Sequence, residues 1–189
     1  EYTSKIIDII GATKGVTVES VGEFLYARHA EERNRRIAEI NPEFEDGGSG
    51  MGTAEARMIL ERIEASPQAA AYDDNAELVD DLREWGIDER VRMGLMTDME
   101  ADTWRKSYSA YVPLKGWAET DFADAQLDIS GVGRAYNTRG QETRRAMGRG
   151  SEAFNPLVAA LTQAQEVAVR SEKNRVGQHL YRLVKEVPA

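Results

Sequence analysis

The chain has 189 residues, of which 41% are hydrophobic and 30% are charged, and it carries a net charge of −9 and no cysteine. This length suits one domain with a packed core, and the missing cysteines exclude disulfides, thiolate zinc sites and cysteine nucleophiles. No apolar run approaches the roughly 20 residues that a membrane-spanning helix needs.

The charge is unevenly distributed along the chain. Residues 130–189 hold 10 Lys/Arg against 5 Asp/Glu, which leaves 14 against 28 in residues 1–129, a balance of −14. Such an acidic body repels a phosphate backbone. We therefore expect an acidic helical body over 1–129, a basic Gly-rich arm or loop over 130–155, and a long C-terminal helix over 156–189 that packs on the body.

The first elements read as helices. The apolar run at residues 4–10 fits a strand or a helix turn, because its length does not decide between them. Residues 17–41 predict a long helix, with Thr17 as its N-cap and Asn41 as its end before Pro42. Apolar residues at the two ends and charged residues between them predict a helix that is packed at both ends and wet in its centre.

Two shorter helices follow. Residues 53–66 predict a helix capped by Thr53. Ser66 and Pro67 predict the start of another, which runs into residues 75–86 and stops at Gly86. The expected buried side of the first of these is Met58, Ile59, Ile63 and Ala56.

The next segments are helical and then irregular. Residues 88–95 and 97–111 predict helical pieces, with Thr97 or Asp98 as the cap of the second. Pro113 and Gly116 frame an extended segment, and the chain up to Asn155 shows little periodicity. We expect a long loop there, which in a compact domain is usually functional or a linker.

The final helix, residues 155–188, has the clearest pattern. Its apolar or small positions step by four and three along one face and then slip to a second series. The polar string Glu172–Arg175 lies where the pattern shifts and favours a solvated face, with contacts to a neighbouring helix or partner as the alternative. The first series is Leu157, Leu161, Ala164, Ala168 and Ser171, and the second is Val176, Leu180, Leu183 and Val187.

These elements predict an all-α fold: a several-helix bundle with a long C-terminal helix and an irregular Gly/Arg-containing arm. The opening at Glu1 rather than methionine leads us to expect a piece of a longer polypeptide.

The glycine-rich stretch from Phe44 to Ala56 poses the first functional question. A phosphate cradle needs a strand before it and a Lys-Ser/Thr pair after it. Here the preceding element is helical and ends in acidic residues, and no lysine follows. A turn between two helices, in which glycine tolerates positive φ, fits better than an anion site at the next helix N-terminus.

The two histidines give weak signals. His29 and Glu32 share a helix face, as half of a carboxylate metal site would, but no second half is visible. A polar histidine on the helix surface is the simpler interpretation of His29, and a packing or surface role is the simpler one for His179. No serine-nucleophile elbow is present. We predict no catalytic residue, metal ligand or cofactor.

The basic arm is the candidate nucleic-acid contact. Arginine with glycine and one tyrosine can follow a phosphate backbone by charge and stacking. A solvated linker, or an arm that folds over the acidic body, is the alternative. The arginines are Arg134, Arg139, Arg144, Arg145 and Arg149.

Several strings occur in an order that resembles the helical regions of very large polyvalent proteins encoded by phages, prophages and conjugative elements. They are FLYARHAEERNRRIAEINPE, DGGSGM, SYSAYVPLKGW and the run GRGSEAFNPLV to LYRLV, and the resemblance spans roughly Glu23 to Val184. Its hallmark positions are Tyr26, Arg28, His29, Gly48, Gly50, Pro113, Lys173, Asn174 and Arg175.

The resemblance implies a non-catalytic structural or interaction module of a large protein delivered into a bacterial host. Its partners would be other domains of the parent polypeptide, another protein or a second copy, with no membrane, and it would reside in the virion or the bacterial cytoplasm. The alternatives are a nucleic-acid-binding module that uses the arm, and an enzyme with an unrecognised site near His29.

Overall fold

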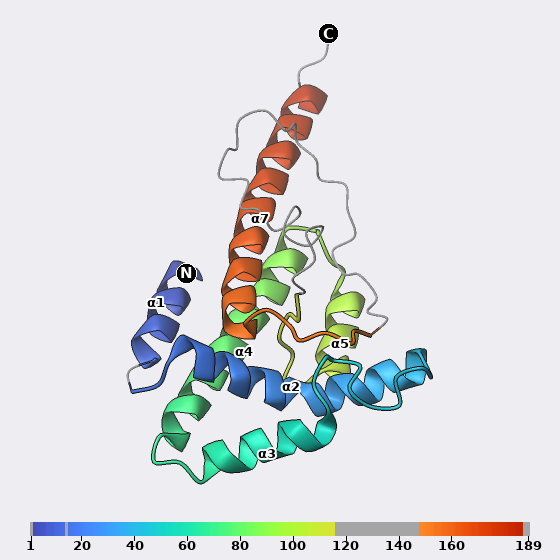
Figure 1. Ribbon diagram of the computed structural model, residues 1–189. Coiled ribbons are helices and arrows are strands. Elements are labelled where there is room, and N and C mark those ends of the chain that lie inside the picture. Colours follow the sequence, from blue (N-terminus) through green and yellow to red (C-terminus); the bar gives the residue numbers. More distant parts are fainter. Residues whose placement is uncertain (1, 14, 116–147, 187–189) are drawn as a thin grey trace.

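A computed structural model describes residues 2–13, 15–115 and 148–186. The described residues form helices and irregular segments, with α7 as the longest element (Figure 1). The helices are α1 (Tyr2–Ala12), α2 (Val18–Ile40), α3 (Thr53–Glu64), α4 (Ala69–Arg92), α5 (Asp98–Ser107) and α7 (Pro156–Glu186). The expected all-α fold with a long C-terminal helix is confirmed.

Helix α2 is the centre of the packing. It lies across the foot of α7 and contacts α3, α4 and α7 (Figure 1). Most of its residues from Val21 to Ala30 are buried. The charged stretch that follows keeps Glu31, Arg35 and Arg36 exposed, as the expectation of a wet centre requires, but Asn34 within that stretch is buried. Neighbours on several sides cover its middle, and they bury even polar side chains there.

Local capping signals place several helix ends. Thr17 and Ser20 form a capping box at the start of α2, and Asn41 ends that helix. Thr97 caps α5, with the Glu100 side chain returning the bond. These ends are as the sequence predicts, because a capping side chain acts on its own first turn.

Other boundaries differ from the prediction. Helix α4 starts at Ala69 rather than at Pro67, and it runs through Gly86 to Arg92 without a stop. Gly86 costs about 1 kcal/mol in a helix interior, but Ile87, just after it, is buried and holds the helix together. The chain turns out of this helix at Gly94, whose φ is +70°.

Two further corrections concern α3 and α5. The N-cap of α3 is Gly52 rather than Thr53. On α3, Ala56, Ile59 and Ile63 are buried as expected, whereas Met58 is 64% exposed. Helix α5 ends at Ser107, and the chain beyond it is extended.

The core lies where α2, α3, α4 and the first half of α7 meet. Helix α1, which the apolar run left undecided, packs on α4 and touches α7. The largest buried hydrophobic side chains there include Ile9, Val21, Leu25, Val79, Val112 and Leu157.

Candidate functional site

The glycine-rich loop is a turn built around a buried serine. Ser49 is completely buried, and its N–H donates to the Asn34 side-chain oxygen at 2.7 Å. The Ser49 hydroxyl donates to the carbonyl of Met51 at 3.0 Å. The loop thus satisfies its polar groups through α2 and through itself.

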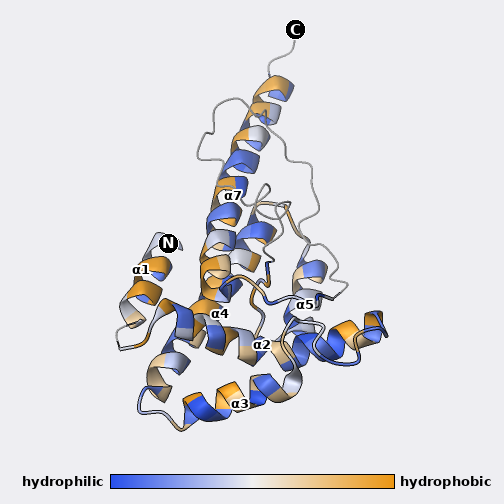
Figure 2. Cartoon of the chain, viewed as in Figure 1, coloured by the Kyte–Doolittle hydropathy of each residue, from blue (hydrophilic) through white to orange (hydrophobic). Residues whose placement is uncertain are grey.

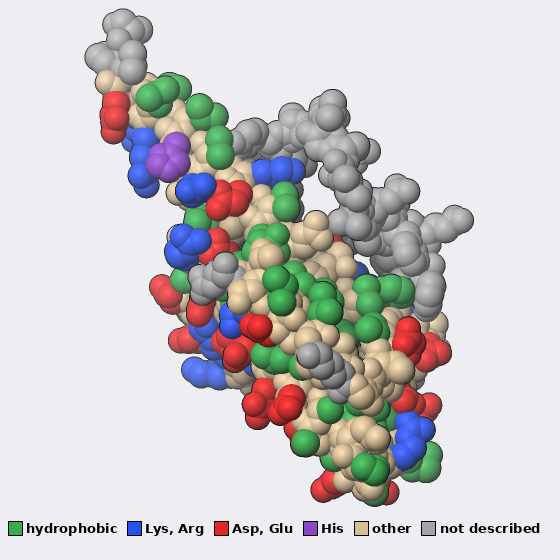
Figure 3. Space-filling model, turned by 90° about the vertical axis from the view of Figure 1, so that its left-hand side faces the viewer, with side chains coloured by type: hydrophobic (Ala, Val, Ile, Leu, Met, Phe, Trp, Pro, Cys, Tyr) green, Lys and Arg blue, Asp and Glu red, His purple; other side chains and the backbone are tan. Residues whose placement is uncertain are grey.

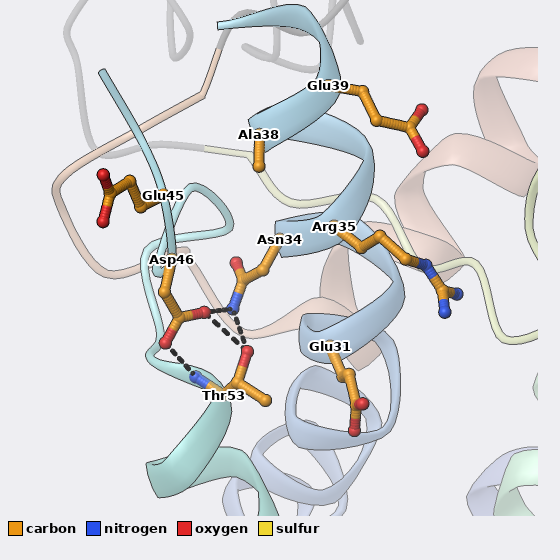
Figure 4. A pocket seen from close by; sticks show the side chains of 8 residues that line it. All are labelled: Glu31, Asn34, Arg35, Ala38, Glu39, Glu45, Asp46 and Thr53. Atoms are coloured by element: carbon orange, nitrogen blue, oxygen red, sulfur yellow. Dashed lines mark hydrogen bonds between the residues drawn. The ribbon is translucent and has the colours of Figure 1, made fainter. Parts of the chain in front are cut away.

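The amides at the start of α3 are capped from within the chain. The Asp46 carboxylate accepts the Thr53 N–H at 2.9 Å, and Asn34 donates to the same carboxylate at 3.0 Å (Figure 4). Hydrogen bonds from the Thr53 side chain and backbone hold the pKa of Asp46 below its usual range. An anion at this helix N-terminus would meet a negative charge that is already in place.

Tyr26 joins the loop to a distant segment. Its hydroxyl donates to the Ser49 carbonyl at 2.9 Å and accepts the N–H of Ala153 at 3.3 Å. Burial raises the pKa of Tyr26 above its ordinary value. Gly50, with φ at +97°, packs so closely that an added Cβ would lie 2.3 Å from the Ser151 carbonyl oxygen.

Arg149 serves the same junction. Its guanidinium donates to the carbonyls of Ser151, Leu114 and Glu152 at 2.8, 3.1 and 3.1 Å. Its own N–H donates to the Gly48 carbonyl at 2.9 Å. This arginine therefore holds together two backbone segments, one at Leu114 and the other at residues 151–152. The other four arginines of the candidate nucleic-acid contact, Arg134, Arg139, Arg144 and Arg145, lie outside the described residues.

His29 is buried, so its interpretation as a surface histidine is wrong. Its ring packs edge-on against Tyr108 and Tyr111, each with a centroid separation of 5.4 Å. Neither ring nitrogen has a hydrogen-bond partner among the described residues. Burial, with Arg33 and other arginines nearby, lowers the pKa of His29 to about 3.

Glu32 lies next to His29 and binds the backbone of the segment that follows α5. Its carboxylate lies 4.0 Å from His29 Nδ1 and accepts the N–H of Ser109 at 2.9 Å. Asn34, which holds the glycine loop, comes five residues after His29 and thus lies roughly 140° around α2. The imidazole and the loop consequently face different surroundings.

Two other hallmark residues hold neighbouring elements. Arg28 pairs with Asp80 and so ties α2 to α4. Pro113 is buried where the segment after α5 passes between α4 and α7.

An open hollow of about 630 Å³ lies beside the loop (Figure 4). Glu31 and Asp46 both line it, and each is bonded within the protein. The hydrogen bond from Arg57 is the main reason that the pKa of Glu31 is lowered. Nowhere in the described ranges do three or more His, Asp or Glu side chains converge as a metal site would require.

The second half of α7 leaves the body. We call residues 172–186 the distal half of α7; it projects beyond the other helices (Figure 1). Asn174 and Gln178 donate to the carbonyl of Met93 at 2.5 and 3.1 Å, at the C-terminal end of α4. Asn174 thus contacts the neighbouring helix, which was the less favoured interpretation of the polar string. Lys173 and Arg175 are exposed, and Arg175 pairs with Glu172 at 2.6 Å.

The slip in the apolar pattern of α7 marks a change of face. Hydrophobic side chains collect on one side of the projecting helix, and Lys, Arg and His on another (Figure 3). The same alternation appears along the ribbon (Figure 2). We call Val169, Val176, Leu180 and Leu183 the outer seam; these side chains are 47%, 45%, 54% and 61% exposed. The sequence step predicts apolar positions here, but not that they point away from the body.

The hallmark residues thus lie in several parts of the fold. Tyr26, Gly48 and Gly50 meet at the junction of the glycine loop with residues 148–155, Arg28 and His29 lie on α2, and Pro113 lies with α4 and α7. Lys173, Asn174 and Arg175 lie on α7, where the projection begins. Sequence reasoning did not find the structural roles of Asn34 and Asp46, because an asparagine on a charged helix and an acidic residue in a loop are ordinary until their contacts are seen.

Comparison of the chain with protein-family models, with curated proteins and with solved structures gives no match. Within the described residues, no helix combines the length and the apolar character that crossing a bilayer requires.

Proposed function

We propose that the chain is a helical interaction module, in which a packed body presents the distal half of α7 to a partner. The outer seam carries this proposal. Val176, Leu180 and Leu183 recur at helical spacing and are each about half exposed. Surface hydrophobic residues scattered singly are normal, but a contiguous stripe marks an interaction site.

The stability of the projecting helix supports the same conclusion. Beyond Gln178, every described residue of α7 is exposed. Most helical stability in proteins comes from tertiary packing, and these residues receive little of it from the described body. A partner on the outer seam would supply that packing.

The biological setting is part of the proposal. The resemblance of several strings to large polyvalent proteins supports a module that joins domains of a phage or mobile-element protein. Such a protein would be carried in the virion and act in the bacterial cytoplasm. The body would then be the rigid support of the projecting helix, since Tyr26 and Arg149 hold distant segments of it together.

Site-specific photocrosslinking tests the interaction. A photoreactive phenylalanine analogue at Leu183 should give adducts in cells that express the chain, whereas the same probe at Arg182 should give none. Arg182 follows Ser171, a fully buried residue, by eleven positions, so it points roughly toward the body side of the helix. Equal labelling from both positions, or none from Leu183, would refute the interaction module.

A further inference from the structure

We propose that the partner of the outer seam is a second copy of this chain, joined through a parallel, in-register pair of α7 helices. The inference rests on the interaction module and specifies its partner. Its first support is spacing: positions 169, 173, 176, 180 and 183 alternate by four and three, the seam of a two-stranded coiled coil.

The direction of the seam permits this pairing. Ser171 is fully buried against the body. Leu180 comes nine residues later, which at 100° per residue places it half a turn around the helix. Two copies joined along this face would therefore keep their bodies on the outside (Figure 1).

Apart from Lys173, the basic residues of the distal half of α7 lie away from the seam. Arg175 and Arg182 follow Ser171 by four and eleven residues, so both lie within roughly 40° of the body side. They would not face their counterparts in a second copy. A pair built on the opposite side of the helix would instead bring like charges together.

Lys173 selects the parallel register. In a parallel pair, a residue at the position of Lys173 inserts into a hole whose lining includes the residue before its counterpart. That residue is Glu172, so each lysine would meet the Glu172 carboxylate of the second copy. An antiparallel pair in which Leu180 lies opposite Val176 of the second copy sets Lys173 against Leu183. A single polar residue at such a core position fixes register and oligomeric state.

The length of the seam sets the expected affinity of the dimer. Val169 to Leu183 covers two heptads, and residues 169–186 rise about 27 Å. Two heptads with one lysine in the core bind weakly. The chain should therefore exchange reversibly between monomer and dimer, with a concentration-dependent mass.

Sedimentation equilibrium of the purified chain tests the second copy. Wild type should fit a monomer–dimer equilibrium, and Leu183→Glu should raise the Kd at least about tenfold. Tyr181→Glu is the matched control, because it adds the same charge at a side chain that is 63% exposed against 61% for Leu183. It lies two residues away, roughly 200° around the helix, so it should leave the Kd unchanged. Circular dichroism checks that both variants keep their helical content.

Single cysteines test the register, because the chain has none of its own. Val176→Cys should form an interchain disulfide under mild oxidation, and Arg182→Cys should not. Failure of Val176→Cys, with crosslinking only in a mixture of Val176→Cys and Leu180→Cys chains, would overturn the parallel register.

A monomer at every concentration would overturn the second copy as partner. If Leu183 then still gave photoadducts to another protein, the interaction module would stand with a different partner. If it gave none, both proposals would fail.

Discussion

The Tyr26 hydroxyl donates to the Ser49 carbonyl at 2.9 Å, across 23 residues of sequence and in a buried setting. The same oxygen accepts the Ala153 N–H at 3.3 Å. One phenol thus satisfies two buried backbone groups from different parts of the chain, and it closes the glycine loop against residues 148–155.

Replacing Tyr26 with phenylalanine should destabilise the fold. The ring would still pack, but a buried carbonyl and a buried N–H would lose their partner, at a cost of about 1–3 kcal/mol each when left unsatisfied. Urea unfolding should show a lower midpoint with little change in slope. Tyr181→Phe, at an exposed position, should not move the midpoint, and equal effects of the two variants would contradict the role of Tyr26.

Gly50→Ala and Gly47→Ala separate backbone strain from close packing. Both glycines have positive φ, at +97° and +75°, but a Cβ at Gly47 would meet nothing within 4 Å. Gly47→Ala should therefore cost about 1–2 kcal/mol for the left-handed conformation alone. Gly50→Ala should cost more, because the methyl group collides with Ser151 and Tyr26. Thermal unfolding measures the difference. Equal costs for the two variants would show that Ser151 and Tyr26 move aside for the methyl group, and would contradict close packing at Gly50.

Protonation of His29 should weaken the fold in acid. Its pKa is about 3 in the folded protein, against an ordinary value of 6.5 for histidine. The unfolded chain therefore binds more protons between these values, and stability falls as pH drops from about 6.5 toward 3. The loss from this group reaches up to roughly 4 kcal/mol.

His29→Phe isolates this effect from the titration of carboxylates. Phenylalanine fits among Tyr108 and Tyr111 and binds no proton. The variant should be at least as stable as wild type at neutral pH, and the stability gap should widen in its favour as the pH falls. Parallel stability curves from pH 7 to 4 would contradict a buried neutral histidine.

Arg149→Lys should lower stability by about 1.5–3 kcal/mol, the range for a hydrogen bond to a charged group. Lysine keeps the charge but cannot reach the three carbonyls with a planar fork. Since those partners are neutral, the loss should persist at high salt. If Arg149→Lys instead left stability unchanged and lowered the affinity for nucleic acid in a salt-sensitive way, Arg149 would be a nucleic-acid contact. Arg182→Lys serves as the exposed control.

Local signals predicted the parts of this fold that depend on a few neighbouring residues. Thr17 and Thr97 cap their helices as expected, because each acts within one turn. Gly86 misled the prediction, because burial of the residues after it outweighs the weak helix propensity of glycine. His29 was misplaced for a related reason: its aromatic neighbours lie about 80 residues further along the chain, where no local pattern reveals them.

The candidate site was likewise predictable only in part from the sequence. The shift in the apolar pattern along α7 was visible in the sequence. Which side of the helix faces the body is known only from the contacts of Asn174 and Gln178 with Met93. The acidic residues before the glycines disfavour phosphate in the sequence analysis, and the structure adds that one of them, Asp46, accepts a hydrogen bond from the first turn of α3. Partners at this distance become known only when the chain is folded.

The contacts around Arg149 also bear on how the chain tolerates changes of length. Leu114 and Lys115 are hydrogen-bonded to Arg149 and Phe154, so the described residues on the two sides of the interval 116–147 meet at one point of the body. An insertion or deletion between these two positions should therefore leave the contacts of the helical body in place.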